Sequence, residues 1–224
     1  MLLLELFKGE EIMFDLSKVK IVITDFDLTL YSYGNWVDAD AYYFKFLKEN
    51  KYVPKTMKSM KDIRAMYPNM HAMKCSFAYL RDNGFDSSKF VEYLKTNIYN
   101  FLTEKTVAID SEIMEKLTQA YDTYLITDSV EEYIDHYMKV FKINKNWFKG
   151  CVSNDYKIKP YTKTRFMKKI MIDEGVAPEE VLMVGDSLEC DIKPAKRLGF
   201  QTVHVTNVAE TERLFLELAS RKNV

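Results

Sequence analysis

Residues 21–31 read IVITDFDLTLY, an apolar run that leads directly into two closely spaced aspartates. The run from Ile21 to Thr24 lacks the polar alternation of a half-exposed strand, so we predict a strand buried on both faces of a parallel sheet. Asp25 and Asp27 follow at its carboxyl end, with Phe26 between them. Two carboxylates this close disfavour each other's ionisation. The arrangement therefore indicates a functional site, and we expect Phe26 to point the opposite way, into the packed interior.

Four further runs share this buried-strand composition and alternate with amphipathic segments. Strands are predicted at 124–126, 150–153, 181–184 and 202–205, and helices at 111–120, 130–141, 164–174 and 188–198. The last two helices end before Gly175 and Gly199, which are suitable residues for a helix C-terminus. The alternation is typical of an α/β fold. We therefore predict a Rossmann-like three-layer α/β/α core with a mostly parallel sheet.

The stretch between the first predicted strand and the rest of the sheet differs in composition. It is rich in Tyr, Phe and Met, shows helical spacing and contains no convincing strand. It is also too long for an ordinary crossover between two strands. We predict a helical cap domain at residues 34–105, inserted into a core domain formed by residues 1–33 and 106–224. Its aromatic residues are expected to form mostly helix core.

The composition excludes several classes of protein. The 224 residues carry a formal net charge of −1 without a basic face, which argues against a nucleic-acid partner. No run approaches the roughly 20 apolar residues that span a bilayer. Three separated cysteines suggest neither a zinc site nor disulfides. We therefore expect a cytoplasmic protein with no membrane partner, and a homodimer through the aromatic-rich cap is possible.

Polar residues gather just after the predicted strands, where ligands bind in open parallel sheets. Besides Asp25 and Asp27, these positions contain Thr127, Asp128, Ser129, Asn154, Asp155, Lys157, Lys159, Asp186, Ser187 and, in the next helix, Asp191. Clustered carboxylates select a hard cation such as Mg²⁺, which neutralises a phosphoryl oxygen. One carboxylate can be a nucleophile, and a second can be an acid and base. The set suits phosphoryl transfer.

The ordered motifs DFDLT, LIT, KP and GDSxxxD, from Ile21 to about Thr206, resemble the haloacid dehalogenase superfamily of phosphohydrolases. The helical insertion looks like the type 1 cap of that superfamily. The resemblance implies that Asp25 is the nucleophile and Asp27 the general acid and base. It also implies that Thr127 binds the phosphoryl group and that Lys159 neutralises the nucleophile and the phosphate.

The same resemblance implies a Mg²⁺ site. Asp25 and Asp186 would bind the ion with the backbone carbonyl of Asp27, and Asp191 would support them by hydrogen bonding. Asp128 is a candidate substrate-binding residue next to Thr127, although the family often has Asn there.

Two departures from the usual motifs concern the lysine and a cysteine. Lys157 competes with Lys159 for the lysine role, and we prefer Lys159 because Pro160 and a helix follow it. Cys190 stands before Asp191, where Asn is common in the family.

The sequence thus predicts a Mg²⁺-dependent phosphatase that hydrolyses a small phosphorylated metabolite through an aspartyl phosphate. A sugar phosphomutase of the same superfamily is one alternative, and a non-catalytic module that binds a phosphorylated ligand or a protein is another. The substrate, whether sugar phosphate, nucleotide, phosphoglycolate or another compound, is left open. Asp25→Asn is expected to abolish turnover and to stabilise the metal-free fold.

Overall fold

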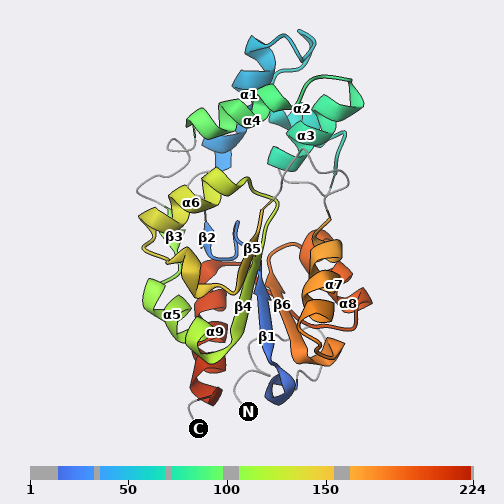
Figure 1. Ribbon diagram of the computed structural model, residues 1–224. Coiled ribbons are helices and arrows are strands. Elements are labelled where there is room, and N and C mark those ends of the chain that lie inside the picture. Colours follow the sequence, from blue (N-terminus) through green and yellow to red (C-terminus); the bar gives the residue numbers. More distant parts are fainter. Residues whose placement is uncertain (1–14, 33–35, 69–71, 98–105, 154–161, 223–224) are drawn as a thin grey trace.

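The computed structural model describes residues 15–32, 36–68, 72–97, 106–153 and 162–222 (Figure 1). Five strands form a parallel sheet in the order β5-β4-β1-β6-β7. They are β1 (Ile21–Thr24), β4 (Asp122–Ile126), β5 (Gly150–Val152), β6 (Val181–Gly185) and β7 (Gln201–His204). All five predicted strands are confirmed, with ends that differ by at most two residues.

The first strand lies at the centre of this sheet. Ile21 pairs with Asp122 of β4 on one side and with Val181 of β6 on the other. All four residues of β1 are buried. Val22 belongs to one hydrophobic cluster, whereas Ile21 and Ile23 belong to a second cluster. Because both faces of the strand are covered, its sequence has no polar alternation.

Helices cover both faces of the sheet and make three layers (Figure 1). One layer consists of α5 (Ser111–Ala120), α6 (Glu131–Val140) and α9 (Val208–Lys222), and the other of α7 (Lys163–Asp173) and α8 (Lys193–Arg197). Leu117, Ile134 and Phe215 fill the core under the first layer, and Met167 and Ala195 fill the core under the second. The predicted α/β/α architecture is confirmed.

Two local differences from the predicted helices are informative. The helix expected at 188–198 is interrupted: a π-helical turn at Leu188–Ile192 precedes α8. Helix α9 is absent from the predicted pattern, although Leu214 and Leu218 bury one of its faces.

Gly175 and Gly199 have φ angles of 63° and 84°, so they end their helices in the left-handed conformation as expected. Short 3-10 turns lie at Leu16–Lys18, Lys145–Trp147 and Pro178–Glu180.

A helical insertion follows the first strand and lies beyond the carboxyl ends of the sheet (Figure 1). It contains α1 (Trp36–Glu49), α2 (Met60–Arg64), α3 (Ala72–Asp82) and α4 (Ser88–Asn97). A two-stranded antiparallel ribbon of β2 (Tyr31–Ser32) and β3 (Val107–Ala108) joins it to the core. The predicted limits of the cap domain, residues 34 and 105, lie outside the described residues.

The aromatic residues of the insertion build its interior. Tyr43, Phe46 and Phe90 are buried, and the rings of Phe46 and Phe90 have centroids 5.0 Å apart. An ion pair of 2.6 Å between Lys95 of α4 and Glu132 of α6 connects the insertion to the core. The interpretation of these aromatic residues as helix core is confirmed, whereas a homodimer through the cap stays a prediction.

Two further observations concern the cysteines and the helices. Cys75, Cys151 and Cys190 are all free thiols. Within the described ranges, none of the helices has the length and apolar character that crossing a membrane requires.

Candidate active site

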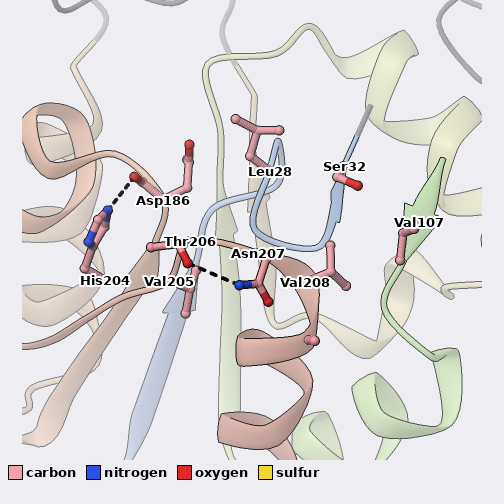
Figure 2. A pocket seen from close by; sticks show the side chains of 10 residues that line it. Leu28, Ser32, Val107, Asp186, His204, Val205, Thr206, Asn207 and Val208 are labelled. Carbon is pink, nitrogen blue, oxygen red and sulfur yellow. Dashed lines mark hydrogen bonds between the residues drawn. The ribbon is translucent and has the colours of Figure 1, made fainter. Parts of the chain in front are cut away.

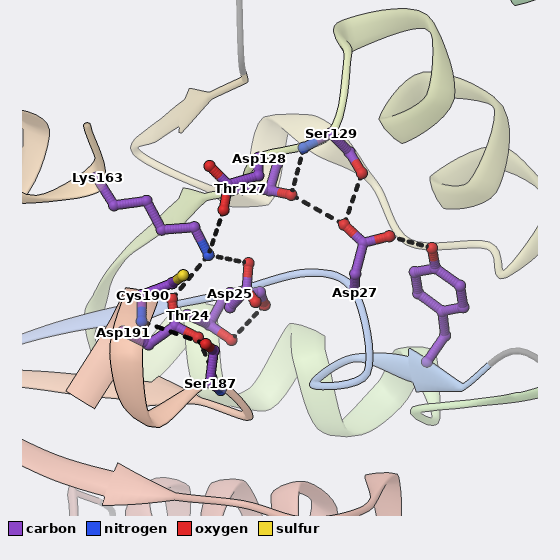
Figure 3. A network of polar contacts seen from close by, with 11 residues as sticks. Thr24, Asp25, Asp27, Thr127, Asp128, Ser129, Lys163, Ser187, Cys190 and Asp191 are labelled. Carbon is purple, nitrogen blue, oxygen red and sulfur yellow. Dashed lines mark hydrogen bonds and ion pairs between the residues drawn. The ribbon is translucent and has the colours of Figure 1, made fainter. Parts of the chain in front are cut away.

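Side chains from several strand ends meet at one edge of the sheet (Figure 3). The residues come from the ends of β1, β4 and β6 and from the π-helical turn after β6: Asp25, Asp27, Thr127, Asp128, Asp186 and Asp191. Parallel strands end at a common edge, so residues that are far apart in the chain converge there. The structure thus brings together the site residues predicted at these three strand ends.

A buried lysine, Lys163, occupies the centre of this group (Figure 3). Its Nζ lies 2.7 Å from an oxygen of Asp25, 2.7 Å from one of Asp191 and 3.9 Å from one of Asp128. Its side chain is only 5% exposed. Burial alone would lower the pKa of Lys163, but the charges of Asp191 and Asp25 prevail and raise that pKa well above its usual value. The lysine is therefore a fixed buried cation.

Three carboxylates form an acidic cluster beside this cation. Asp25, Asp186 and Asp191 each offer an oxygen atom, and these atoms all lie within 4.8 Å of one another. Burial, followed by the charge of Asp191, raises the pKa of Asp25 well above its ordinary value. The same two causes raise the pKa of Asp186 to about 6. Burial and the neighbouring negative charge therefore both disfavour the ionised forms of Asp25 and Asp186.

A divalent cation would supply the missing charge. When Asp25, Asp186 and Asp191 are all ionised, the single ammonium of Lys163 leaves two negative charges uncompensated. Carboxylate oxygens are the ligands that Mg²⁺ prefers. The residues present therefore fit a magnesium ion in both charge and ligand chemistry.

Close packing fixes the carboxylate of Asp191. One of its oxygens accepts a hydrogen bond of 3.1 Å from the backbone N–H of Ser187. A Cβ atom added to Gly185 would lie 2.6 Å from the Cβ, Cγ and Oδ2 atoms of Asp191. Position 185 requires glycine because the Asp191 side chain approaches the backbone there. Close packing thus explains the first residue of the GDS motif.

The carboxylate of Asp27 points toward a different set of partners (Figure 3). Its Oδ1 accepts a hydrogen bond of 2.5 Å from the hydroxyl of Tyr31. Its Oδ2 accepts from Thr127 at 3.1 Å and from Ser129 at 2.6 Å. The side chain therefore lies outside the acidic cluster of Asp25, Asp186 and Asp191. The predicted contribution of the Asp27 backbone carbonyl to a metal site stays a prediction.

The neighbours of Asp27 in the chain show how the turn is built. Phe26 is fully buried and packs on the ring of Tyr31, with centroids 5.0 Å apart, which confirms its inward orientation. Leu28 has a φ angle of 62°, in the left-handed region. That conformation costs an ordinary residue about 1 kcal/mol. The chain thus accepts local strain directly after the two aspartates.

A cavity of about 540 Å³ lies beside this cluster (Figure 2). Leu28, Ser32 and Asp186 line it together with residues of the segment after β7. His204 of β7 also lines it, and its Nε2 lies 2.8 Å from the backbone oxygen of Asp186. A carbonyl oxygen only accepts hydrogen bonds, so this nitrogen carries the proton. The contact ties the loop that carries Asp186 to the neighbouring strand.

The family assignment follows from the sequence in combination with this geometry. A sequence profile described as haloacid dehalogenase-like hydrolase matches residues 22–205, well over half of the chain. The protein belongs to this family. The matched region contains the whole parallel sheet except for Ile21, and it contains every residue of the cluster.

Solved structures of several haloacid dehalogenase-like proteins share this fold. A predicted phosphoglycolate phosphatase from Haemophilus somnus has a TM-score of 0.60 and 17% identity, over 87% of this chain and 91% of that one. A putative haloacid dehalogenase-like hydrolase from Bacteroides fragilis has a TM-score of 0.59 and 17% identity, over 88% and 93%. A putative hydrolase from Bacillus subtilis, bound to magnesium, has a TM-score of 0.55 and 18% identity, over 88% and 99%. No curated protein matches the chain by sequence.

One residue of this haloacid dehalogenase-like site is missing from the predicted set. Lys157 and Lys159 lie outside the described residues, and the ammonium in contact with Asp25 belongs to Lys163. Lys163 is the first residue of α7, after the N-cap Thr162. A positive charge is unfavourable at a helix N-terminus. That mismatch is a signal in the sequence that marks Lys163 as a candidate functional residue.

The hydroxyl groups of Ser129 and Tyr31 also contact Asp27, and the sequence motifs assign a role to neither. For Ser129, the position directly after β4 is the signal in the sequence that places it near the site. Tyr31 lies in what reads as a short apolar pair, so nothing in the local pattern indicates a contact with a carboxylate.

Proposed function

We propose that the protein is a Mg²⁺-dependent phosphatase that hydrolyses a small phosphorylated metabolite through an aspartyl phosphate on Asp25. The observation that carries this proposal is the buried contact between Lys163 and Asp25, beside the hydroxyl-bearing end of β4. An adjacent ammonium favours the ionised, nucleophilic form of a buried carboxylate. It also offers a donor to the oxygen atoms of a transferring phosphoryl group.

In the first step, an oxygen of Asp25 attacks the phosphorus and a new phosphorus–oxygen bond forms. The bond between phosphorus and the leaving alcohol breaks, and Asp27 gives the leaving oxygen a proton. The ammonium of Lys163 binds the other phosphoryl oxygens as their charge is redistributed. The hydroxyl of Thr127, which donates to Asp27 in the structure, would turn to the substrate and donate to a phosphoryl oxygen at this step. The products of this step are the free alcohol and the aspartyl phosphate.

In the second step, water attacks the phosphorus of the aspartyl phosphate. Asp27, now a carboxylate, accepts a proton from this water. The bond between phosphorus and the Asp25 oxygen breaks, which releases inorganic phosphate and restores the Asp25 carboxylate. Asp27 ends protonated, as it began, so the cycle is closed.

Asp25 and Asp186, with the backbone carbonyl of Asp27, are the proposed ligands of Mg²⁺, and Asp191 supports them. When bound, the ion neutralises charge on the phosphoryl oxygens and on the clustered carboxylates. The related Bacillus subtilis protein is described with bound magnesium, which agrees with this assignment.

The proposal departs from the sequence motifs in its choice of lysine, because the KP motif indicates Lys159. We assign the role to Lys163 because its Nζ touches both Asp25 and Asp191. Asp128, at 3.9 Å from the same Nζ, would act on the substrate by orienting that ammonium.

We also propose that helices α1 to α4, within residues 34–105, form a cap that shields the site from water and selects the substrate. Its position beyond the carboxyl ends of the strands supports this role (Figure 1). The fold of the Bacillus subtilis protein, whose structures reveal interdomain movement, allows such a part to shift.

The test is phosphate release from a panel of sugar phosphates, nucleoside monophosphates and phosphoglycolate, with Mg²⁺ and with EDTA. Phosphoglycolate belongs in the panel because the Haemophilus somnus protein is a predicted phosphoglycolate phosphatase. We expect the wild type to release phosphate with Mg²⁺ and not with EDTA. In Asp25→Asn we expect kcat to fall by at least about 10³-fold. Asp173→Asn, at an exposed position of α7, is the matched control.

Three outcomes would contradict the proposal. An Asp25→Asn variant that is as active as the wild type would exclude Asp25 as the nucleophile. Transfer of phosphate between positions of one sugar, with little release, would indicate a mutase. Binding of phosphorylated compounds without turnover would indicate a non-catalytic module.

A further inference from the structure

The hydroxyl of Tyr31 lies at the end of a buried aromatic group. The side chain is fully buried, and its ring centroid lies 5.0 Å from that of Phe26, 4.9 Å from that of Tyr137 and 5.4 Å from that of Phe141. These contacts leave the ring little freedom, so its hydroxyl has a fixed position. That hydroxyl donates to Asp27 Oδ1 at 2.5 Å.

Tyr31 also lies at the point where the chain leaves the core for the helical insertion. It belongs to β2, where it pairs with Ala108 of β3, and its backbone forms a bridge with Asp27. The two strands are the entry and the exit of the insertion. The contact from Tyr31 to Asp27 therefore connects the base of the insertion to the acidic site.

Three hydroxyl groups together hold the Asp27 carboxylate. Thr127 and Ser129 donate to Oδ2 from the end of β4, and Tyr31 donates to Oδ1 from the opposite side. Tyr31 thus donates to one carboxylate oxygen, and Thr127 and Ser129 share the other. Without the Tyr31 hydroxyl, Oδ1 loses a short hydrogen bond that helps to fix the rotation of the carboxylate group.

We propose that Tyr31 is a positioning residue for the acid and base Asp27. Tyr31 belongs to β2, so the ribbon at the base of the insertion places its hydroxyl beside Asp27. The proposal rests on the function proposed above. It assigns to the Tyr31 hydroxyl the orientation of Asp27 toward the leaving oxygen and, later, toward the attacking water. A misplaced catalytic group costs about 10- to 100-fold in rate.

Two variants separate this role from packing. Tyr31→Phe removes the hydroxyl and keeps the ring. Tyr137→Phe removes a buried hydroxyl from the same aromatic group, where it donates to the hydroxyl of Tyr133 at 2.8 Å. Both variants lose one buried hydrogen bond, so a general effect on stability would appear in both.

The kinetic readout uses p-nitrophenyl phosphate and an alkyl phosphate that the wild type hydrolyses. p-Nitrophenolate leaves without protonation, so the first step with this substrate needs little acid catalysis, whereas the second step still needs the base. For Tyr31→Phe we expect kcat with p-nitrophenyl phosphate to fall about 10-fold or more while kcat/KM stays near the wild-type value. With the alkyl phosphate, kcat/KM should fall by a similar factor, because its departure requires the proton.

A structural readout does not depend on activity. In crystal structures of the two variants, we expect the Asp27 carboxylate to turn away from its present position in Tyr31→Phe and to keep it in Tyr137→Phe. The positioning role would be overturned if Tyr31→Phe and Tyr137→Phe lost equal amounts of kcat, or if the Asp27 carboxylate kept its position in Tyr31→Phe. An equal fall of kcat/KM with both substrates in Tyr31→Phe would overturn it as well. A wild type that hydrolyses no phosphate ester would instead refute the proposed function, and with it the catalytic meaning of this contact.

Discussion

The ammonium of Lys163 lies 2.7 Å from an oxygen of Asp25, and both side chains are about 95% buried. This pair joins the start of α7 to the end of β1, two segments separated by 138 positions in the chain. The same ammonium lies 2.7 Å from Asp191. A single buried cation thus compensates part of the charge of two carboxylates, which makes the site sensitive to any change at Lys163.

Replacement of Lys163 by Met should reduce both stability and turnover. Removal of one partner of a buried ion pair costs about 3–5 kcal/mol because the remaining charges stay buried without compensation. We expect a lower free energy of unfolding in urea and a loss of at least about 100-fold in kcat. Lys169→Met, on the exposed side of the same helix, is the control and should behave as the wild type.

The same measurement on Lys159→Met separates the two candidate lysines. If Lys163 has the role proposed here, Lys159→Met keeps most of its activity. Loss of activity in Lys159→Met together with an active Lys163→Met would favour the KP motif instead.

Asp25→Asn should stabilise the metal-free protein at neutral pH. Burial and neighbouring carboxylates raise the pKa of Asp25 well above 3.8 in the folded state, so the ionised form is unfavourable there. A raised pKa stabilises the fold below the unfolded value and loses that contribution as pH rises through the folded value. Asparagine does not titrate, so the advantage of the variant should grow with pH.

Urea unfolding in EDTA at pH 5 and pH 8 measures this advantage. The free-energy difference between Asp25→Asn and the wild type should be larger at pH 8. A variant that is less stable than the wild type at pH 8 would show that the lost contact with Lys163 outweighs the relief of repulsion.

Binding of Mg²⁺ should release protons and weaken at low pH. The pKa of Asp186 is raised to about 6 by burial and by Asp191, so this carboxyl is partly protonated between pH 5 and 7. The ion competes with that proton. Calorimetric titrations in buffers of different ionisation enthalpy should show proton release near pH 6, and the part of it that comes from Asp186 should fall toward pH 8.

The variant Asp186→Asn provides the comparison for this titration. It lacks the titrating carboxyl, so its Mg²⁺ affinity should be lower throughout and should change less between pH 5 and 7. Equal proton release by the variant and the wild type would exclude Asp186 as the source.

Gly185→Ala should disrupt the site without adding charge. The new Cβ would lie 2.6 Å from atoms of Asp191, so the Asp191 side chain or the backbone beside it must shift. We expect the free energy of unfolding to fall by about 1–3 kcal/mol through over-packing, and turnover to fall as well. Thermal melting and phosphate release check both effects.

Gly84→Ala is the comparison for that substitution. Gly84 has a φ of 71° with no atom near its missing Cβ, so alanine there should cost about 1 kcal/mol and leave the site intact. A Gly185→Ala variant with wild-type activity would mean that Asp191 can shift without consequence.

The fold and most of the acidic site can be predicted from the amino-acid sequence. The run from Ile21 to Thr24 is apolar because a central strand is covered on both faces, and this pattern of burial is local enough to read from the chain. The aspartates after β1 and β6 could be grouped because parallel strands end at one edge. The interruption of the helix at 188–198 is harder to predict from the sequence. The π-helical turn there brings Asp191 against Gly185, and this contact joins two different elements.

The tertiary structure was needed to show which lysine contacts Asp25 and which hydroxyl groups contact Asp27. The sequence favours Lys159 because Pro160 and a helix follow it, whereas the contact of Lys163 with Asp25 depends on where α7 begins relative to the sheet. Tyr31 stands in a short apolar pair with Leu30, yet its hydroxyl contacts Asp27 because the aromatic group around Phe26 fixes its ring. Both contacts depend on distances between separate elements, and local propensity and periodicity carry no information about such distances.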